Sequence, residues 1–292
     1  MWCRNRDSRH GVSSRGQVVN SSSRFEYALA ISDLDEALAL QATDGTAWLA
    51  FADPRYEAFN AMFGGWTAAI LLRAIQLRSN TDATPSAITV NFFEKIAAGS
   101  SITVNARRLG GGRSIEHWQS TITDADDQTV LAQAMGVLSR RRPSTGHTEP
   151  KMPYAPDPSS LPLLHPPNNF GQRTDMRPVD GLLQFGRMET RSVHWTKEMS
   201  GRTIDHVQLA FLSDAYAPRS FYWSDGPGPS ATITLSTYFH GTVDEITAIG
   251  DDYVLTEATG TRGVESTSGQ QARLWSRGGA LIATTEQLAW YR

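Results

Sequence analysis

The 292-residue sequence has one cysteine, Cys3, which excludes an internal disulfide, a redox-active thiol pair and a cysteine-based metal site. It has no run of 18 apolar residues, and its first residues lack the apolar segment of a secretory signal. The 30 acidic and 27 basic residues leave a net charge of -3, which argues against nucleic acid or a membrane surface as a partner. These absences predict a soluble cytoplasmic protein without a membrane span.

The first 24 residues differ in composition from the rest of the chain. They contain five arginines, one acid and several serines, and they show almost no apolar periodicity. Such a segment cannot offset the entropy that is lost on ordering. We expect a disordered tail. A transit peptide and an upstream false start are the alternatives, although no amphipathic helix can be drawn through the segment.

Two apolar segments predict buried helices. Residues 63–74 are apolar on nearly every side, and residues 204–215 repeat the pattern at an offset of 141, which is 214 minus 73. Asp205 has the character of an N-cap for the second helix. Strand candidates rich in β-branched and aromatic residues follow each helix, at 87–93, 101–107, 115–123, 129–136, 232–238, 254–261, 271–276 and 280–287. Each half therefore predicts one buried helix followed by an antiparallel meander.

A proline-rich stretch separates the two halves. Eight prolines fall within residues 142–169, a density that permits neither a helix nor an interior strand. The length of the chain is sufficient for two domains. We therefore predict a division into a tail, an N-terminal half, a linker and a C-terminal half, at residues 1–24, 25–142, 143–169 and 170–292.

The duplicated pattern resembles the double hot-dog fold of the bacterial acyl-CoA thioesterase II family. The resemblance covers roughly residues 46–292 and is carried by FGG at 63–65, LSD at 212–214, ATI at 231–233, YFH at 238–240 and ATTEQ at 283–287. It implies an α+β protein of two tandem repeats, in each of which a curved antiparallel sheet wraps a central helix. It also implies hydrolysis of acyl-CoA to a free carboxylic acid and CoA, without a cofactor.

The resemblance further implies three catalytic residues. In the family an aspartate, a threonine or serine, and a glutamine hold and activate the water that hydrolyses the thioester. By motif position these resemble Asp214, Thr232 and Gln287. The family's second strand more often carries an acid or a histidine at positions 234–235, so Thr234 and Ser236 are alternatives to Thr232.

The pattern around Asp214 makes chemical sense by itself. Its carboxylate is expected on an apolar stripe of the second helix, where burial raises the pKa towards the range of a general base while hydrogen bonds from Thr232 and Gln287 keep it ionised. A structural aspartate bonded to the backbone or to Arg219 is the alternative. At the offsets between the halves, positions 73, 87 and 136 of the first half correspond to Asp214, Thr232 and Gln287. They carry arginine, alanine and glycine, and the loss of all three polar groups from one half favours a single composite site.

For the chemical step, we expect direct attack by water rather than by Asp214.

Glycines at the start of the first helix are candidates for binding the oxyanion. Gly64 and Gly65 would present backbone N–H groups at a helix N-terminus, although close packing explains them equally well. Arg113 follows a triple glycine that predicts a hairpin turn, from which it could contact the phosphates of CoA. The histidines lack metal-ligand spacing and no G-x-S-x-G motif occurs, so neither a metal site nor a serine nucleophile is expected.

Three further questions stay open at this point. A non-catalytic acyl-thioester-binding protein and a hot-dog enoyl-CoA hydratase are alternative functions. The acyl chain length is undetermined, and aromatic residues that could narrow the acyl tunnel are Trp66, Phe92, Phe93, Phe211, Tyr216 and Tyr238. A homodimer or larger assembly is expected because the strand faces carry the apolar residues Ile102, Val104, Ile115 and Trp118.

Overall fold

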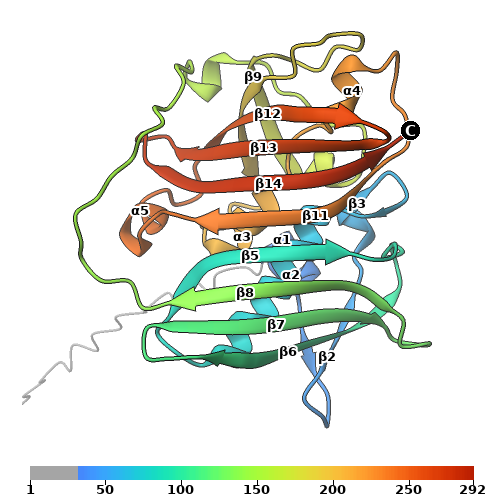
Figure 1. Ribbon diagram of the computed structural model, residues 1–292, viewed down its shortest axis with the longest axis vertical. Helices are drawn as coiled ribbons and strands as arrows, with labels where there is room; N and C mark the ends of the chain where they lie inside the picture. The colour runs from blue at the N-terminus through green and yellow to red at the C-terminus, as the bar shows by residue number, and fades with distance from the viewer. Residues whose placement is uncertain (1–31) are drawn as a thin grey trace, which may run out of the picture. The chain divides into compact units, whose positions relative to one another are not determined.

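An antiparallel sheet of twelve strands organises residues 32–292, the part of the chain that the computed structural model describes (Figure 1). Its strands are Gln41–Ala42 (β1), Trp48–Phe51 (β2), Thr84–Phe92 (β5), Ser101–Gly111 (β6), Ile115–Asp124 (β7), Val130–Ser139 (β8), Thr174–Asp180 (β9), Ser192–Glu198 (β10), Ser230–Phe239 (β11), Val254–Val264 (β12), Thr267–Ser276 (β13) and Leu281–Tyr291 (β14). A separate hairpin pairs Glu57–Ala58 (β3) with Ala61–Met62 (β4). The predicted tail at 1–24 and Cys3 lie outside the described residues.

Short helices and 3₁₀ turns connect the strands. They are Asp33–Ala37 (α1), Gly64–Ser79 (α2), His206–Leu212 (α3), Ser220–Trp223 (α4), Val243–Thr247 (α5), Pro54–Tyr56 (η1), Pro158–Ser160 (η2) and Phe170–Arg173 (η3). No helix in residues 32–292 is long and apolar enough to cross a membrane.

The strand order places β5 and β11 side by side. The full order is β1-β2-β6-β7-β8-β5-β11-β14-β13-β12-β10-β9, and Ser236 of β11 is paired with Thr89 of β5. Helices α2 and α3 lie together behind this sheet (Figure 1). Trp66 and Leu71 of α2 and Phe211 of α3 are completely buried between the helices and the sheet. Burial of such large apolar side chains is the main source of stability for this arrangement.

The two predicted helices exist with different ends. The first continues through Ser79, whereas the second ends at Leu212, so Asp214 lies beyond the helix and not on its apolar stripe. Ser213 is the C-cap, and Pro218 follows closely; the residue before a proline avoids helical geometry. The predicted N-cap at Asp205 is confirmed, because its side chain accepts the N–H of Gln208.

All eight predicted strands are present, as β5 to β8 and β11 to β14. The predicted hairpin turn is present between β6 and β7, at residues 112–114, and Gly110 and Gly111 are the last residues of β6, where Gly111 has a φ of 119°. Strands β9 and β10 and the short strands β1 to β4 were not predicted. β9 contains Pro178 and lies at the edge of the sheet, where a proline costs no ladder hydrogen bond. Residues 143–169 contain the 3₁₀ turn η2 and one isolated bridge, Leu164 to Met176, among the described elements.

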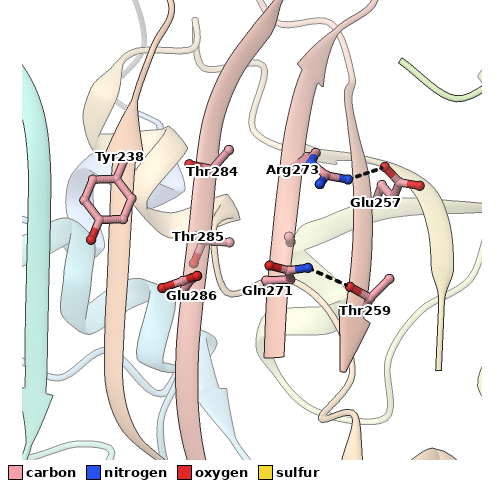
Figure 2. Close-up of a pocket in the computed structure, with 9 residues that line it drawn as sticks. Tyr238, Glu257, Thr259, Gln271, Arg273, Thr284, Thr285 and Glu286 are labelled. Carbon is pink, nitrogen blue, oxygen red and sulfur yellow. Dashed lines mark hydrogen bonds and ion pairs between the residues drawn. The ribbon is translucent and has the colours of Figure 1, made fainter. Parts of the chain in front are cut away.

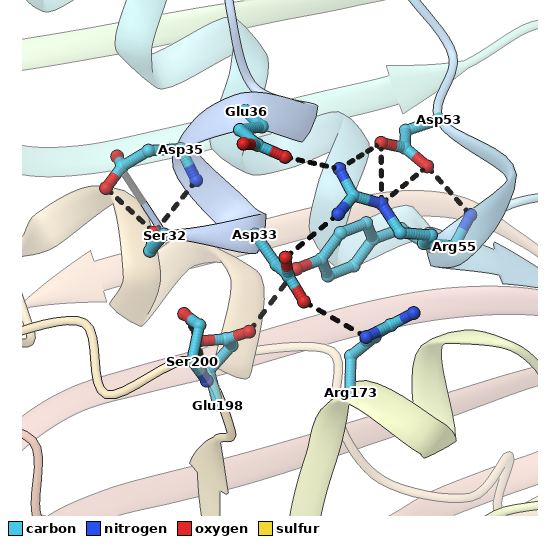
Figure 3. Close-up of polar contacts among 10 residues, drawn as sticks. Ser32, Asp33, Asp35, Glu36, Asp53, Arg55, Arg173, Glu198 and Ser200 are labelled. Atoms are coloured by element: carbon cyan, nitrogen blue, oxygen red, sulfur yellow. Dashed lines mark hydrogen bonds and ion pairs between the residues drawn. The ribbon is translucent and has the colours of Figure 1, made fainter. Parts of the chain in front are cut away.

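A network of charged residues anchors α1 (Figure 3). Asp33 accepts hydrogen bonds from Arg55 of η1 and from Arg173 of η3, at 2.9 and 3.0 Å. Asp35 pairs with Arg73 of α2 and with Arg202, which precedes α3, both at 3.1 Å. Because these arginines come from both halves of the sequence, α1 is tied to both helices of the core.

Candidate active site

The carboxylate of Asp214 lies where the end of α3 meets the start of α2. Its Oδ1 accepts a hydrogen bond of 2.6 Å from Nε2 of Gln287, which is on β14. The backbone N–H of Gly65 also donates to this carboxylate. A Cβ atom on Gly64 would stand 2.6 Å from Oδ2, so the absence of a side chain there lets the helix approach. The site therefore combines groups from both halves of the sequence.

The environment of Asp214 changes its acidity. Burial raises the pKa of Asp214 to about 7, although the hydrogen bonds from Gln287 and from the Gly65 N–H act in the opposite direction. The residue as a whole is only partly buried. A carboxylate with this pKa has the properties of a general base at neutral pH.

Arg219 does not pair with Asp214. Its guanidinium is buried and donates to the carbonyl oxygens of Ala217 and Thr190 and to Oγ of Ser192. A structural ion pair between Arg219 and Asp214 is thus contradicted. The backbone partner of Asp214 is instead Gly65, in the opposite half of the chain.

Thr232 reaches the cluster through Gln287. Its Oγ1 donates to Oε1 of Gln287 at 3.3 Å, and no hydrogen bond joins it to Asp214, which differs from the expected direct contact. The pairing of β11 with β14 shifts between Thr232 and Thr234. This irregularity leaves Thr232 on the same face as the buried Leu235, which a regular alternation would forbid.

The alternatives to Thr232 point away from the cluster. Strand residues alternate in direction, and Leu235 and Thr237 are fully buried, so Thr234 and Ser236 face the other side of the sheet. There Oγ of Ser236 forms a 2.9 Å hydrogen bond with Oγ1 of Thr89 across the β5–β11 pair. The geometry brings Thr232, and neither alternative, to Gln287.

The glycine pair has a different role from the one expected. Gly65 donates its N–H to Asp214 and is therefore engaged by the carboxylate. Its α-carbon also packs so tightly that a Cβ would collide with the carbonyl oxygen of Phe211. Close packing is therefore observed at Gly65, whereas binding of the oxyanion by these glycines stays a prediction. Gly64, the first residue of α2, is the remaining oxyanion candidate of the two.

Arg113 is not brought to this cluster. The β6–β7 turn lies beside the Thr84 end of β5, because Ile115 and Thr84 are both paired with Ser139. The cluster lies at the Phe92 end, where the Phe92 ring comes near Gly64. A nine-residue strand spans about 30 Å at about 3.3 Å per residue. Contact between Arg113 and a ligand held at Asp214 is not supported within this chain.

One residue next to the cluster, Gln270, was not predicted from the sequence. Gln270 on β13 donates from Nε2 to Oε1 of Gln287 at 2.7 Å, and its own Oε1 accepts the backbone N–H of Arg219 at 2.8 Å. The sequence did contain a signal for it. Gln270 is two and four residues before the apolar Ala272 and Leu274, and residues at this spacing on a strand share a face, so Gln270 is expected to face inward with them. Tyr216, one of the predicted tunnel aromatics, has a buried hydroxyl without a hydrogen-bond partner among the described residues.

The other predicted tunnel aromatics fall into separate regions. Trp66 is buried and donates to the carbonyl oxygen of Ala37, whereas Phe93 is exposed. Tyr238 lines a polar hollow on the outer face of the sheet, together with Thr284, Glu286 and residues of β12 and β13 (Figure 2). None of the three catalytic candidates lines this hollow. The described residues contain no cluster of three or more potential metal-ligating side chains.

Two family models match this chain. The model of the acyl-CoA thioesterase N-terminal domain matches residues 52–139, and that of the acyl-CoA thioesterase C-terminal domain matches residues 147–291. The chain belongs to the acyl-CoA thioesterase family. As a member, it is an acyl-CoA thioesterase in general activity. A search of curated protein sequences finds no match.

Solved structures agree with this membership. A conserved protein of unknown function with a hot dog fold from Alicyclobacillus acidocaldarius is 29% identical, with a TM-score of 0.83 over 89% of this chain and 97% of its own. A tesB protein of Mycobacterium avium subspecies paratuberculosis is 20% identical, with a TM-score of 0.74 over 89% and 98%. An acyl-CoA thioesterase II of Mycobacterium marinum is 18% identical, with a TM-score of 0.70 over 89% and 98%. The fold of this thioesterase is thus of the hot-dog type.

Proposed function

We propose that this acyl-CoA thioesterase releases a carboxylic acid and CoA by direct attack of a water molecule that Asp214 activates. One observation carries the proposal: a carboxylate whose pKa is raised to about 7 lies between the Gln287 amide and the start of α2. A base with this pKa is substantially ionised at neutral pH and still accepts a proton readily.

The reaction then has a defined proton balance. Asp214 takes one proton from the water, and the water oxygen bonds to the carbonyl carbon of the thioester. The carbonyl oxygen becomes negative, and its return to a double bond breaks the carbon–sulfur bond. The proton on Asp214 then passes to the departing thiolate of CoA. Gln287 uses one N–H for Asp214, and the second N–H of its amide is available to hold the water.

The start of α2 supplies the charge stabilisation. Its first N–H groups have no acceptor within the helix, and the helix dipole favours negative charge at this end. With Gly65 engaged by Asp214, we assign the oxyanion contact to the N–H of Gly64.

A covalent route through Asp214 is the mechanistic alternative. It would form a mixed anhydride on the carboxylate, which a second step would hydrolyse. The contacts from Gln287 and Gly65 favour direct attack, because they hold the carboxylate in place. In a single turnover in oxygen-18 water with enzyme in excess, the label should enter the carboxylic acid and leave the Asp214 peptide unlabelled. Label on that peptide would overturn the direct route.

Release of free thiol from acyl-CoA esters ranging from acetyl to palmitoyl tests the function. The Asp214→Asn variant should lose about 10²-fold or more in kcat, as expected when a general base is removed. Asp225→Asn, a change on an exposed aspartate, is the matched control and should keep wild-type turnover. Full activity in Asp214→Asn would refute the role of Asp214.

The same assay separates the two alternative functions. A non-catalytic binding protein would retain acyl-CoA and release no thiol with any chain length. A hydratase would convert an enoyl-CoA into a hydroxyacyl-CoA, again without free thiol. The panel also reports the preferred chain length.

We also propose that the two halves, 25–142 and 170–292, are repeats joined by the linker at 143–169. The strands after α2 follow the spatial order β5-β8-β7-β6, and those after α3 follow β11-β14-β13-β12. The first strand of each set has a register shift, at Ser86 and at Ile233. Aligning these shifts gives an offset of 147, which is 233 minus 86, and makes Pro85 the equivalent of Thr232 in the first half. The first half then again lacks a hydroxyl at that position.

A homodimer stays part of the proposal, and of the four residues expected to support it only Ile115, at 42% exposed, still does. Ile102, Val104 and Trp118 are buried within the chain, so they give no reason for assembly. Met135 and Leu288 are likewise 42% exposed on strands of the sheet, and all three side chains would be covered by a second copy. Light scattering that shows a monomer of 32.1 kDa at micromolar concentration would exclude it. The cytoplasmic location stays a prediction.

A further inference from the structure

A chain of hydrogen bonds leads from the backbone of Arg219 to Asp214. The Arg219 N–H donates to Oε1 of Gln270 at 2.8 Å. Nε2 of Gln270 donates to Oε1 of Gln287 at 2.7 Å. Nε2 of Gln287 donates to Oδ1 of Asp214 at 2.6 Å. Every link donates in the same direction, towards the carboxylate.

The origin of this chain fixes its direction. A backbone N–H can only donate, so Gln270 must turn its oxygen to Arg219 and its nitrogen to Gln287. Gln287 must then turn its oxygen to Gln270 and its nitrogen to Asp214. Thr232 supports the same orientation as a second donor to the Gln287 oxygen.

The surroundings keep this orientation rigid. Gln270 and Gln287 are directly opposite each other on β13 and β14, and each is only 5% exposed. Little solvent can therefore compete for their amide groups. Arg219 itself is held by its side-chain bonds to Ala217, Thr190 and Ser192.

We propose that Gln270 is a positioning residue, which orients the Gln287 amide so that an N–H, rather than a carbonyl oxygen, faces Asp214. This inference rests on the proposed role of Asp214 as the base. Gln270 does not touch Asp214, and it acts only through Gln287.

The chemical consequence follows from the two orientations of an amide. With an N–H towards it, the ionised carboxylate is stabilised. With the carbonyl oxygen towards it, the carboxylate loses a donor and meets a negative partial charge. Loss of Gln270 should therefore raise the pKa of Asp214 further and weaken the hold on the water.

The test compares two substitutions at Gln270. Gln270→Met has a similar size without an amide, and it should lower kcat about tenfold, leave KM nearly unchanged and move the acidic limb of kcat up by about one pH unit. Gln270→Glu keeps the acceptor for Arg219 and, when ionised, lacks the donor for Gln287. It should reverse the Gln287 amide and have a larger effect in the same direction.

Gln271 provides the matched controls. It follows Gln270 on β13 but lies on the outer face, where its Nε2 is 3.4 Å from Oγ1 of Thr259 (Figure 2). Gln271→Met and Gln271→Glu make the same chemical changes and should leave kcat and its pH profile as in the wild type. The Gln271→Glu control also shows what an added charge does by itself.

A readout without turnover separates this inference from the proposed function. Titration of carbon-13-labelled aspartate by NMR, with the Asp214 signal identified by its loss in Asp214→Asn, should show the pKa of Asp214 about one unit higher in Gln270→Met. An unchanged pKa and an unchanged acidic limb in a folded Gln270→Met would overturn the positioning role. Failure of both Gln270 variants to fold would overturn it too, in favour of a structural role. Absence of thiol release by the wild-type protein would instead refute the proposed function.

Discussion

Gly64 and Asp214 are so close that a Cβ atom on the glycine would stand 2.6 Å from Oδ2 of the aspartate. The two residues come from opposite halves of the sequence, one at the start of α2 and the other just beyond α3. The contact therefore joins the two halves at the point where the proposed chemistry occurs. Both positions 64 and 65 require glycine, but for different reasons, since a Cβ at position 64 would meet the Asp214 side chain and a Cβ at position 65 would meet the backbone of Phe211.

Gly64→Ala should reduce activity more than stability. Its new Cβ meets the end of a side chain, so Asp214 can move aside, but the move disturbs the bond to Gln287. We expect a loss of about 10²-fold in kcat, a typical cost of misplacing a reacting group by about 1 Å. Thermal melting should change little.

Gly65→Ala should instead lower stability as well. Its Cβ would meet the backbone carbonyl of Phe211, which cannot move without shifting α3 against α2. Overpacking of this kind costs about 1–3 kcal/mol in the free energy of unfolding. Gly110→Ala, whose Cβ would have no neighbour within 4 Å, is the control and should be neutral. If Gly65→Ala were as stable in urea unfolding as Gly64→Ala and Gly110→Ala, the close approach of the helices would be contradicted.

The pH dependence of turnover should follow the ionisation of Asp214. Burial raises its pKa to about 7, and a general base must be ionised, so kcat/KM should fall as the pH drops through about 7. The descent should correspond to one proton. Rates measured between pH 5 and pH 9 would show this limb. A profile that stays flat down to pH 5 would contradict the assignment of Asp214 as the base.

Some of this site could be predicted from the sequence, because motif position indicates Asp214, Thr232 and Gln287, of which the last two lie on the predicted strands β11 and β14. The end of α3 was missed, since the apolar run continues to Ala215 while the chain turns before Pro218. The strand irregularity that turns Thr232 inward has no sequence signature. These local patterns therefore predict candidate residues but not the contacts among them.

Arg113 shows a second limit of sequence reasoning. Its hairpin turn was predicted from local residues, and the turn is present. The end of the sheet at which that turn lies depends on pairing between distant strands, which local patterns do not report. β9 was missed for a related reason, because a strand containing Pro178 is tolerated only at the edge position that the tertiary fold provides.

Asp214→Asn should make the protein more stable at high pH. The pKa of Asp214 is raised from 3.8 to about 7, so folding favours the protonated form, and the wild-type protein loses stability as the pH rises from about 4 to about 7. Above that range the cost is constant and at most about 4 kcal/mol, less any hydration that this partly buried residue retains. The amide variant avoids this cost.

Urea unfolding at several pH values checks the sign of this effect. The pH-dependent part of the difference between Asp214→Asn and the wild type should be largest above pH 7 and should vanish below about pH 3, where the wild-type carboxyl is protonated in both states. A difference that is independent of pH would show that the variant acts through packing and not through the charge.

Thr232 and Thr234 offer a matched pair for testing which hydroxyl belongs to the site. Thr232→Val removes the 3.3 Å bond to Oε1 of Gln287 while keeping the shape of the side chain. Gln287 then retains Gln270 as its remaining donor, so we expect a moderate loss of about tenfold in kcat. Thr234→Val makes the same change on the opposite face of β11 and should keep wild-type kcat. If Thr234→Val is the impaired variant, the register of β11 is shifted by one residue and the face now given to Thr232 is wrong.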